Sequence, residues 1–324
     1  MTEPTMSAGD VLDMLDWLPE GAKAISSAIA GAGNMNLVER VTLSDGSSLI
    51  LKRAHGWVEK YPDIPAPIAR AGVEAAFYSA VYGTPVGAAM PLHLAYDDAH
   101  AANLFEDLGE GTDGMTAYAG TPIAMADLDW VIDWMIALHD LAVPSNTRLT
   151  NHAMRLLNAV HIFDFPLDPN SGFDLDAITL GLQEVADQLK ADAAFVESVK
   201  AFGQTYLETD EGVLLHGDLY PGSWLITTQG LRIIDPEFCW IGPREWDVGV
   251  LAAHLILSGQ DDALIDRIYT RYRGPIDRTL ADKISGIEIM RRLIGVAQLP
   301  LAADLAEKTA LLERARHMVA GSRS

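Results

Sequence analysis

Hydrophobic and polar positions are spaced in two different ways along the chain, and the change divides it into two parts. Short apolar runs with strand-like spacing dominate up to residue 108, and longer runs with helical spacing dominate after it. Residues 37–41 and 48–52 are predicted as two strands around an Asp45-Gly46 turn, because an Asp-Gly pair favours a tight hairpin. The pattern therefore predicts an α+β chain whose β-rich part precedes a mainly helical part.

The same spacing of apolar and polar residues predicts the remaining elements. In the first part it predicts a helical lead-in over 11–30, a helix over 68–81, and strands over 86–94 and 101–105. In the second part it predicts helices over 128–141, 182–206, 245–258, 262–272 and 280–299, and strands over 213–215, 224–227 and 231–234. Residues 106–109 interrupt the pattern, so we place the boundary between an N-lobe, 1–108, and a C-lobe, 109–324, at this point.

Composition excludes several classes of protein. The formal net charge is −22, and such an acidic surface repels nucleic acid and anionic membranes. The longest strongly apolar stretch, residues 248–257, is far shorter than the roughly 20 residues of a membrane span. Cys239 is the only cysteine, and the first residues lack the features of a signal peptide, so we expect a cytoplasmic protein.

The most informative segment lies within residues 214–249. Asp218 follows a His-Gly pair, Ser223 follows five positions later, and Asp235 ends the apolar run 231–234. Phosphoryl transfer from ATP needs a carboxylate that orients the attacking hydroxyl and oxygen ligands for Mg²⁺. Protein kinases place an Asp and an Asn at the same five-residue offset and follow them with a metal-binding Asp. We therefore predict a small-molecule kinase with Asp218 as the catalytic base.

The metal ligands are predicted from the same segment. Asp235 and Glu237 are two carboxylates at a strand end, which suits a hard cation with oxygen ligands. Ser223 would supply a neutral oxygen where kinases often use Asn. The alternative for Glu237 is an ion pair with a nearby arginine such as Arg244.

A nucleotide site is predicted in the first part of the chain. Gly33, Asn34 and Asn36 lie in a glycine-containing turn whose backbone N–H groups could approach phosphates. Lys52 ends the following apolar strand and Glu74 lies on the next helix, as in the kinase pair that holds the α- and β-phosphates. The alternatives are an ordinary turn and two surface charges.

The connector between the two parts could read the adenine edge through its backbone, which makes Glu106 and Leu108 candidates; a plain acidic linker is the alternative. The sequence contains neither G-x-x-x-x-G-K nor G-x-S-x-G, which argues against a P-loop NTPase and an α/β-hydrolase.

Acceptor residues are predicted near the C-terminus. Arg291 and Arg292 are adjacent on one helix, so we expect only one of them to point into a site; the guanidinium group suits a polyol or a developing phosphate. Ordinary surface salt bridges are the alternative. Trp246 lines the acceptor pocket or belongs to the core.

With these motifs, the chain resembles the aminoglycoside phosphotransferase-like kinases, whose signature is HGD followed by a metal-binding side chain five residues after the Asp. Within that superfamily it is most similar to the 5-methylthioribose kinases. The matching segments, which extend over both parts, are GNMNLVERV (33–41), HGDLYPGS (216–223), IDPEF (234–238) with the later Gly-Pro and Asp247, and MRRLIGVA (290–297).

The resemblance implies a bilobal kinase-like fold, Mg-ATP, and phosphorylation of the 1-hydroxyl of a 5-substituted ribose. It implies Asp218 as base, Asp235 and Glu237 as metal ligands, and Arg291 and Arg292 near the sugar. The chain departs from the family at Tyr220, at Pro221 and at residues 244–246, so another sugar or sugar-like alcohol stays open as acceptor.

Two other functions stay open. One is an aminoglycoside- or choline-type phosphotransferase with a different acceptor, and the other is a nucleotide-binding pseudokinase without catalysis. The sequence does not choose between ATP and GTP as donor, and it leaves the oligomeric state open, a homodimer included.

Overall fold

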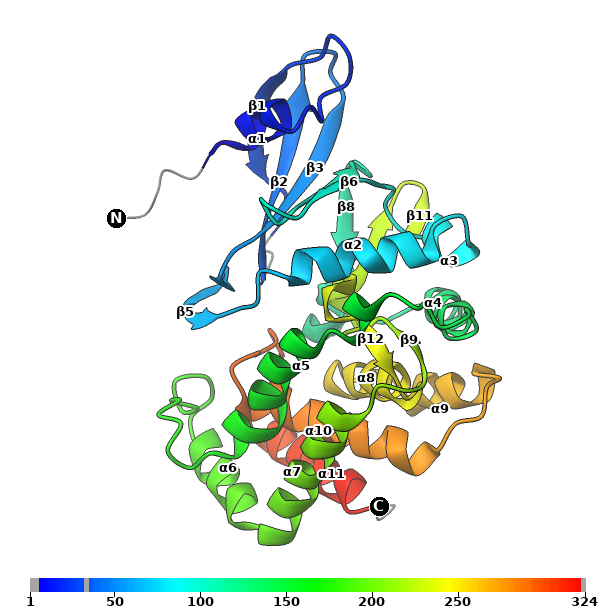
Figure 1. Cartoon of the computed structure of the whole chain (residues 1–324). Coiled ribbons are helices and arrows are strands. Elements are labelled where there is room, and N and C mark those ends of the chain that lie inside the picture. The colour runs from blue at the N-terminus through cyan, green and yellow to red at the C-terminus, as the bar shows by residue number, and fades with distance from the viewer. Residues whose placement is uncertain (1–5, 32–34, 322–324) are drawn as a thin grey trace.

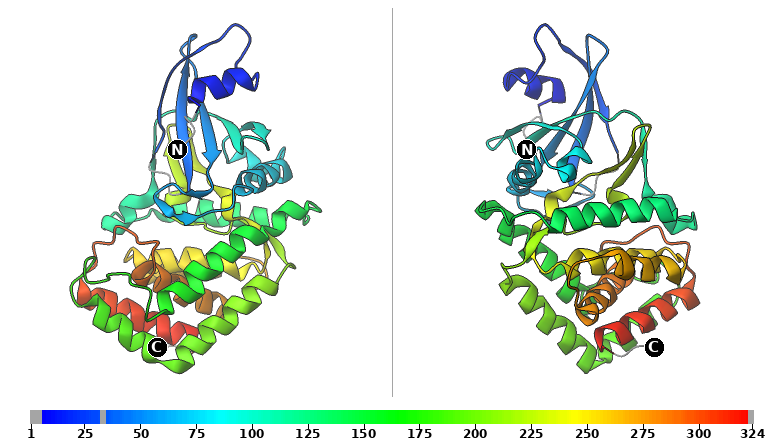
Figure 2. Two further views of the ribbon diagram at one scale, coloured as in Figure 1. Left: turned by 60° about the vertical axis from the view of Figure 1, so that its left-hand side comes forward. Right: turned by 90° about the vertical axis from the view of Figure 1, so that its right-hand side faces the viewer.

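The computed structural model describes residues 6–31 and 35–321. A sheet with few helices forms the upper part of the molecule in Figure 1, and helices form most of the lower part. Figure 2 shows the same arrangement from two further sides. The predicted α+β class, with a β-rich part followed by a mainly helical part, is confirmed, whereas the exact boundary after residue 108 stays a prediction.

The upper part is built on a five-stranded antiparallel sheet in the order β1-β2-β3-β7-β6. Its strands are β1 (Ala24–Ile29), β2 (Asn36–Leu43), β3 (Ser48–Ala54), β6 (His93–Asp97) and β7 (Ala102–Glu106). Helix α1 (Ala8–Met14) covers one face through Val11 and Leu12, which join a buried cluster with Val41 and Leu51. Helix α2 (Arg70–Val81) and the short α3 (Pro85–Ala88) follow, and a small hairpin of β4 (Trp57–Val58) and β5 (Tyr61–Pro65) projects beside them.

Two predictions for the upper part are wrong. The helical lead-in over 11–30 is helical only as far as Met14, and residues 24–29 form edge strand β1, whose mostly exposed side chains carry no alternating pattern. The strand over 86–94 begins instead as helix α3, because Thr84 caps it by accepting from the Gly87 N–H at 3.3 Å, and Pro85 favours the first helical position. The strand pair β2–β3 and helix α2 agree with their predictions.

The chain after β7 holds eight α-helices and the remaining short strands within the described residues. Strands β8 and β11 lie beside the upper part in Figure 1. The helices are α4 (Met125–His139), α5 (His152–Ala159), α6 (Leu182–Ala191), α7 (Ala193–Glu208), α8 (Glu245–Leu257), α9 (Asp262–Arg271), α10 (Arg278–Ile294) and α11 (Leu305–Val319). The strands are β8 (Gly111–Asp113), β9 (Val213–Leu215), β10 (Trp224–Thr227), β11 (Gly230–Ile233) and β12 (Trp240–Gly242). They form the sheets β11-β10-β8 and β12-β9.

Two predicted boundaries after β7 need correction. The helical run 182–206 is two helices, because the Asp192 side chain accepts from the Phe195 N–H at 3.1 Å and starts α7. The helix predicted to residue 299 ends at Ile294, before Gly295. Helices α5 and α11 and strands β8 and β12 were not predicted.

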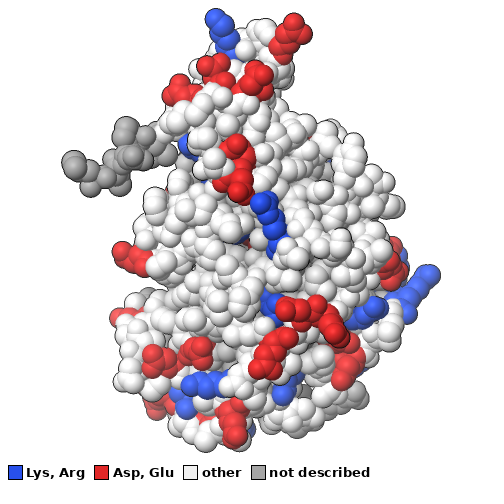
Figure 3. All heavy atoms as spheres, viewed as in Figure 1, with Lys and Arg blue, Asp and Glu red and all other residues white. Residues whose placement is uncertain are grey.

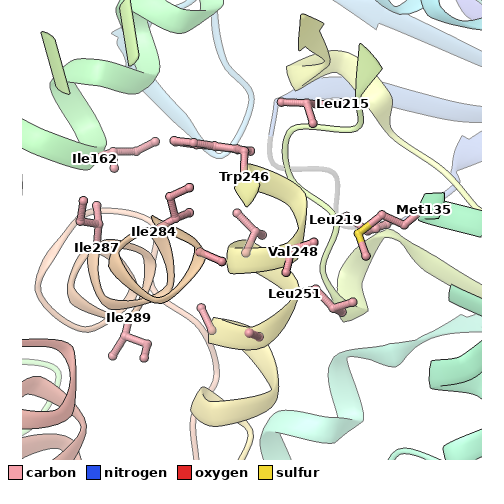
Figure 4. Close-up of a cluster of buried hydrophobic side chains, with 14 of the residues drawn as sticks. Met135, Ile162, Leu215, Leu219, Trp246, Val248, Leu251, Ile284, Ile287 and Ile289 are labelled. Carbon is pink, nitrogen blue, oxygen red and sulfur yellow. The ribbon is translucent and has the colours of Figure 1, made fainter. Parts of the chain in front are cut away.

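The core is organised around α8, which is buried along its whole length. In Figure 4, Trp246 of α8 lies on the side of Ile284 of α10, whereas Leu251 lies on the opposite side of α8, toward Leu219 and Met135. A helix that is buried on every side must be surrounded by other elements, so packing against α8 fixes the place of α10. This packing determines where the last turn of α10, with its two arginines, lies. No helix among the described residues combines the length and the hydrophobicity needed to span a bilayer.

Candidate active site

A cleft of about 1420 Å³ lies between the sheet and the helical part, and groups from both parts line it. That volume exceeds the roughly 300–1,000 Å³ of an ordinary small-molecule pocket, so two ligands could share it. Figure 3 shows acidic and basic side chains interspersed on one face of the molecule. Among the predicted site residues that the structure describes, eight line the cleft: Lys52, Glu74, Glu106, Leu108, Asp218, Asp235, Arg291 and Arg292.

The buried carboxylate of Asp247 holds the backbone of the loop that carries Asp218. Asp247 accepts from the backbone N–H groups of His216 at 2.8 Å and Gly217 at 2.9 Å, and it contacts His139 Nε2 at 3.1 Å. Burial alone would raise the pKa of Asp247, but the hydrogen bond and charge of His139 hold it below its ordinary value. An ionised Asp247 at the start of α8 therefore anchors the loop.

Two further features fix the path of this loop. Gly217 has φ +88°, and a Cβ there would lie 2.0 Å from the Phe238 carbonyl oxygen, so only glycine fits. Burial lowers the pKa of His216, and its Nε2 donates to the Ile234 carbonyl at 3.0 Å. Since Ile234 directly precedes Asp235, the His216 ring ties the two acidic segments together.

Asp218 faces both arginines of α10. Arg291 Nη2 lies 3.1 Å and Arg292 Nη2 3.0 Å from Asp218 Oδ1. Glu288, one turn earlier, accepts from Arg292 Nε at 2.8 Å and also from Arg291 Nε. The prediction that only one of the two arginines points into the site is therefore wrong, because their long side chains converge on the same carboxylates.

This ion-pair network continues into the core. Glu288 Oε1 lies 3.0 Å from His254 Nε2, and His254 Nδ1 contacts the Tyr118 hydroxyl. Asp218, His254 and Glu288 place ligand atoms within 4.8 Å of one another, a spacing compatible with a cation site. The two guanidinium groups already balance both carboxylates, so we interpret the cluster as an ion-pair network. The spacing of Glu288 to the arginines, i to i+3 and i+4, is a helical ion-pair signal that the sequence reading missed.

On the opposite wall, Lys52 connects strand β3 to two carboxylates. Its Nζ lies 3.0 Å from Glu74 Oε1 on α2 and 2.8 Å from Asp235 Oδ1. The Lys52 and Glu74 side chains are buried, whereas that of Asp235 is 51% exposed. Asp235 has φ +61°, a left-handed conformation that is uncommon for a non-glycine residue. This turn at the end of β11 directs an accessible carboxylate into the cleft.

Glu237 and Asn36 lie outside the cleft lining. Asn36 Nδ2 donates to Glu237 Oε2 at 2.6 Å, and Arg70 Nε lies 3.7 Å from the same oxygen. The predicted alternative, a pair with Arg244, therefore names the wrong partner. Burial raises the pKa of Glu237, against the opposing attraction of Lys52. In this arrangement the side chain connects β2 and α2 to the segment after Asp235.

Ser223 and Trp246 are also buried away from the cleft. The Ser223 hydroxyl donates to the Tyr220 carbonyl at 2.7 Å and accepts from the Tyr220 N–H at 3.1 Å. The Trp246 indole N–H donates to the Gly217 carbonyl at 2.9 Å, and its ring stacks on Tyr206. These contacts indicate that Ser223 and Trp246 stabilise the backbone of the loop around Asp218 on the side away from the cleft.

The connector is fixed by its own acidic side chains. Asp107 accepts from Arg40 Nε at 2.6 Å and Nη2 at 3.0 Å, and from the Ser48 hydroxyl at 2.6 Å. Glu106 Oε1 accepts from the Leu92 N–H at 2.7 Å. These contacts tie the connector to strands β2 and β3.

Gly33 and Asn34 lie outside the described residues, although Gly31 and Met35 on either side line the cleft. The sequence reading also missed His161 and Tyr61, which line the cleft from a helix and from the β4–β5 hairpin. Neither stands in a recognisable motif, so no local signal could have found them.

Comparison with known sequences identifies phosphotransferases as relatives of this chain. The sequence model described as "Phosphotransferase enzyme family" matches residues 28–282. The methylthioribose kinase of Bacillus mycoides is 27% identical over 242 residues, which cover 70% of this chain and 59% of that protein. The methylthioribose kinase of Bacillus cereus is 28% identical over 256 residues, which cover 75% and 63%. The chain thus spans about three fifths of the length of these two relatives.

Comparison with solved structures confirms the predicted kinase-like fold. Spectinomycin phosphotransferase in complex with ADP and spectinomycin aligns with a TM-score of 0.56 at 13% identity, covering 98% of each chain. Choline kinase LicA from Streptococcus pneumoniae aligns with a TM-score of 0.53 at 12% identity, covering 96% of this chain and 98% of that one. At such identities the likeness shows the fold alone. The family match over residues 28–282, together with the cleft, shows that this chain belongs to the phosphotransferase enzyme family.

Proposed function

We propose that this protein transfers the γ-phosphate of ATP to a hydroxyl of a sugar, with the 1-hydroxyl of 5-methylthioribose or a related 5-substituted pentose as the first candidate. The observation that carries the proposal is the position of Asp218, which shares one cleft with the Lys52–Glu74–Asp235 group and faces two guanidinium groups. In this proposal residues 1–108 hold the nucleotide, and residues 109–324 hold the acceptor and the catalytic base.

Each residue has a defined task in this reaction. Lys52, held by Glu74, pairs with the α- and β-phosphates, and the backbone of Glu106 and Leu108 contacts the adenine edge. Asp218 orients the acceptor hydroxyl and accepts its proton as the oxygen attacks phosphorus. Arg291 and Arg292 then turn from Asp218 toward the sugar and the developing phosphate charge. Catalysis consists mainly of positioning and charge stabilisation.

The metal site is supported best at Asp235. Mg²⁺ is usually bound by one or two carboxylates together with substrate phosphates and water, and Asp235 offers an accessible carboxylate beside Lys52. Bound there, Mg²⁺ would supply charge neutralisation at the β- and γ-phosphates. Glu237 and Ser223 would have to leave their present hydrogen bonds to become ligands. We therefore propose Asp235 as the principal ligand.

The charge balance around Asp218 supports a neutral acceptor. Two carboxylates, Asp218 and Glu288, face two guanidinium groups, Arg291 and Arg292, so these four side chains together carry no net negative charge that would attract a cation. A neutral sugar fits this balance better than choline or an aminoglycoside. The intact Lys52–Glu74–Asp235 group likewise favours a catalyst over a pseudokinase.

The acceptor is tested by measuring magnesium-dependent ADP release with 5-methylthioribose, 5-deoxyribose, ribose, choline and several aminoglycosides. We expect turnover with the 5-substituted riboses and little with the cations. Turnover with cationic acceptors alone would replace the proposed acceptor class. ATP binding without turnover on any member of the panel would favour the pseudokinase.

The pH dependence of kcat/KM for ATP should report the ionisation of Glu74. Burial raises the pKa of Glu74 from 4.5 to about 7, the nearby Glu237 and Asp235 charges act in the same direction, and Lys52 opposes them. The ionised form is the one that holds Lys52, and it is lost as the pH falls through about 7. We expect kcat/KM for ATP, measured at saturating acceptor, to decline on the acidic side, since this ratio reports groups of the enzyme form that binds ATP.

The Glu74→Gln variant is the control, because its side chain does not titrate; it should lose the acidic decline at a lower overall rate. The same decline in Glu74→Gln as in the unmodified protein would assign the titration to another group.

A further inference from the structure

Glu288 contacts the two arginines of α10 through the same atom of each, the Nε atom nearest to the chain. Its Oε1 atom accepts from Arg292 Nε at 2.8 Å, and its Oε2 atom accepts from Arg291 Nε. The spacings i, i+3 and i, i+4 put the three side chains on one side of the helix. A guanidinium group has five N–H donors, so these contacts leave its Nη groups for other partners.

The Nη groups of both arginines reach the cleft. Arg291 Nη2 lies 3.1 Å and Arg292 Nη2 3.0 Å from Asp218 Oδ1, and these three residues line the cleft. Glu288 does not line it, and its side chain is only 3% exposed. A ligand in the cleft can replace Asp218 as the partner of the Nη groups, whereas the Nε contacts lie out of its reach. Each arginine therefore has one end fixed in the core and one end open to a ligand.

Glu288 is itself fixed by a hydrogen-bonded chain that runs into α8. Burial lowers the pKa of His254, so its imidazole is neutral and has one donor and one acceptor. A carboxylate only accepts, so His254 Nε2 donates to Glu288 Oε1 at 3.0 Å and Nδ1 accepts from the Tyr118 hydroxyl. Burial alone would raise the pKa of Glu288, but the charges of the two arginines and the His254 hydrogen bond hold it well below its ordinary value. Glu288 is thus an ionised carboxylate with a fixed orientation.

We propose that Glu288 is a positioning residue, which holds Arg291 and Arg292 by their Nε atoms so that their Nη groups bind oxygen atoms of the acceptor sugar. Side chains that are already held in place lose little rotamer freedom when a ligand binds, so a fixed arginine binds more tightly than a free one. The proposal rests on the proposed function, because it concerns the same acceptor. Glu288 touches no substrate and acts only through the two arginines.

The first test is Glu288→Gln. The amide keeps the size of the side chain but offers one accepting oxygen where the carboxylate offers two, so at least one arginine loses its Nε contact. The KM for 5-methylthioribose should rise about tenfold, the effect of one lost hydrogen bond to a charged group. The KM for ATP should change little, since Lys52 and Glu74 lie on the opposite wall.

Glu313→Gln is the matched control. Glu313 of α11 accepts from Arg316 Nε at 3.2 Å with the same i, i+3 spacing, but this pair lies on the surface. Its loss should leave both KM values unchanged, because exposed ion pairs contribute little. Should Glu288→Gln fail to fold, Glu288→Asp replaces it. That variant keeps the buried charge, but its shorter side chain cannot reach both Nε atoms, so the acceptor KM should still rise.

A double-mutant cycle separates positioning from a general structural effect. Arg291→Met removes one of the two side chains through which Glu288 acts. The rise in acceptor KM caused by Glu288→Gln should therefore be smaller in the Arg291→Met protein than in the unmodified protein. Residues that act through one another give such non-additive effects, whereas independent effects add.

Three results would contradict the proposal. An unchanged acceptor KM in folded Glu288→Gln and Glu288→Asp would overturn the role of Glu288 and leave the sugar kinase intact. An equal rise of both KM values, with additive effects in the cycle, would assign Glu288 to stability alone. No turnover of any sugar by the unmodified protein would overturn the proposed function, and the role of Glu288 with it.

Discussion

Asp218→Asn is expected to lower kcat by about 10³-fold, within the range that a positioned acid or base contributes to catalysis. The amide keeps the size of the side chain but cannot accept the proton of the acceptor hydroxyl. ATP affinity should remain close to that of the unmodified protein, because Lys52, Glu74 and Asp235 keep their contacts on the opposite wall. Single-turnover kinetics with the best acceptor, together with calorimetric titration of ATP, would measure both quantities.

The variant also removes one of the two carboxylates that balance Arg291 and Arg292, so its folding must be checked. The melting temperature should fall moderately, since Glu288 still contacts both arginines. Asp262→Asn, at an exposed carboxylate on α9, is the matched control and should retain full activity. A folded Asp218→Asn protein that retains kcat would exclude Asp218 as the base, and one that loses ATP binding would assign it to the nucleotide.

Asp235→Asn should have the second large effect, a loss of about 10²–10³-fold in kcat, as found when one preorganised charge-stabilising group is removed. An amide is a weaker ligand for Mg²⁺ than a carboxylate, and the change also removes the 2.8 Å ion pair with Lys52. The Mg²⁺ concentration for half-maximal activity at saturating ATP should therefore rise. A magnesium titration of the initial rate measures this shift.

Glu237→Gln separates the metal role from a structural one. Since Glu237 is buried and bonded to Asn36, we expect it to lower the melting temperature and to leave the magnesium dependence unchanged. A shift in magnesium dependence as large as that of Asp235→Asn would restore Glu237 as a second ligand. An unchanged magnesium dependence in Asp235→Asn would remove Asp235 from the metal site.

The motif around Asp218 could be identified from the sequence because its features are local. The order of Asp218, Ser223 and Asp235, the glycine between His216 and Asp218, and the apolar run before Asp235 are properties of neighbouring residues. Lys52 at the end of an apolar strand and Glu74 on the next helix were recognised in the same way. The family and the α+β class followed from these patterns.

Edge strand β1 shows where local patterns fail. Its side chains are mostly exposed, so its sequence carries neither the alternation of a half-buried strand nor an apolar stripe, and only pairing with β2 makes it a strand. Helix α3 was missed for a different reason, because a capping threonine followed by proline outweighed the apolar residues that suggested a strand.

Contacts between residues far apart in the chain could not be predicted from the sequence. Asn36 and Glu237 are 201 positions apart, and Arg292 and Asp218 are 74 apart. Whether Glu237 faces metal or arginine, and whether two adjacent arginines diverge or converge, depends on how α2, α8 and α10 pack. The chain alone therefore established which chemical groups the protein carries and in what order, since motifs and propensities act over a few residues. Folding established which of them meet and which are buried, since both depend on packing between elements far apart in the chain.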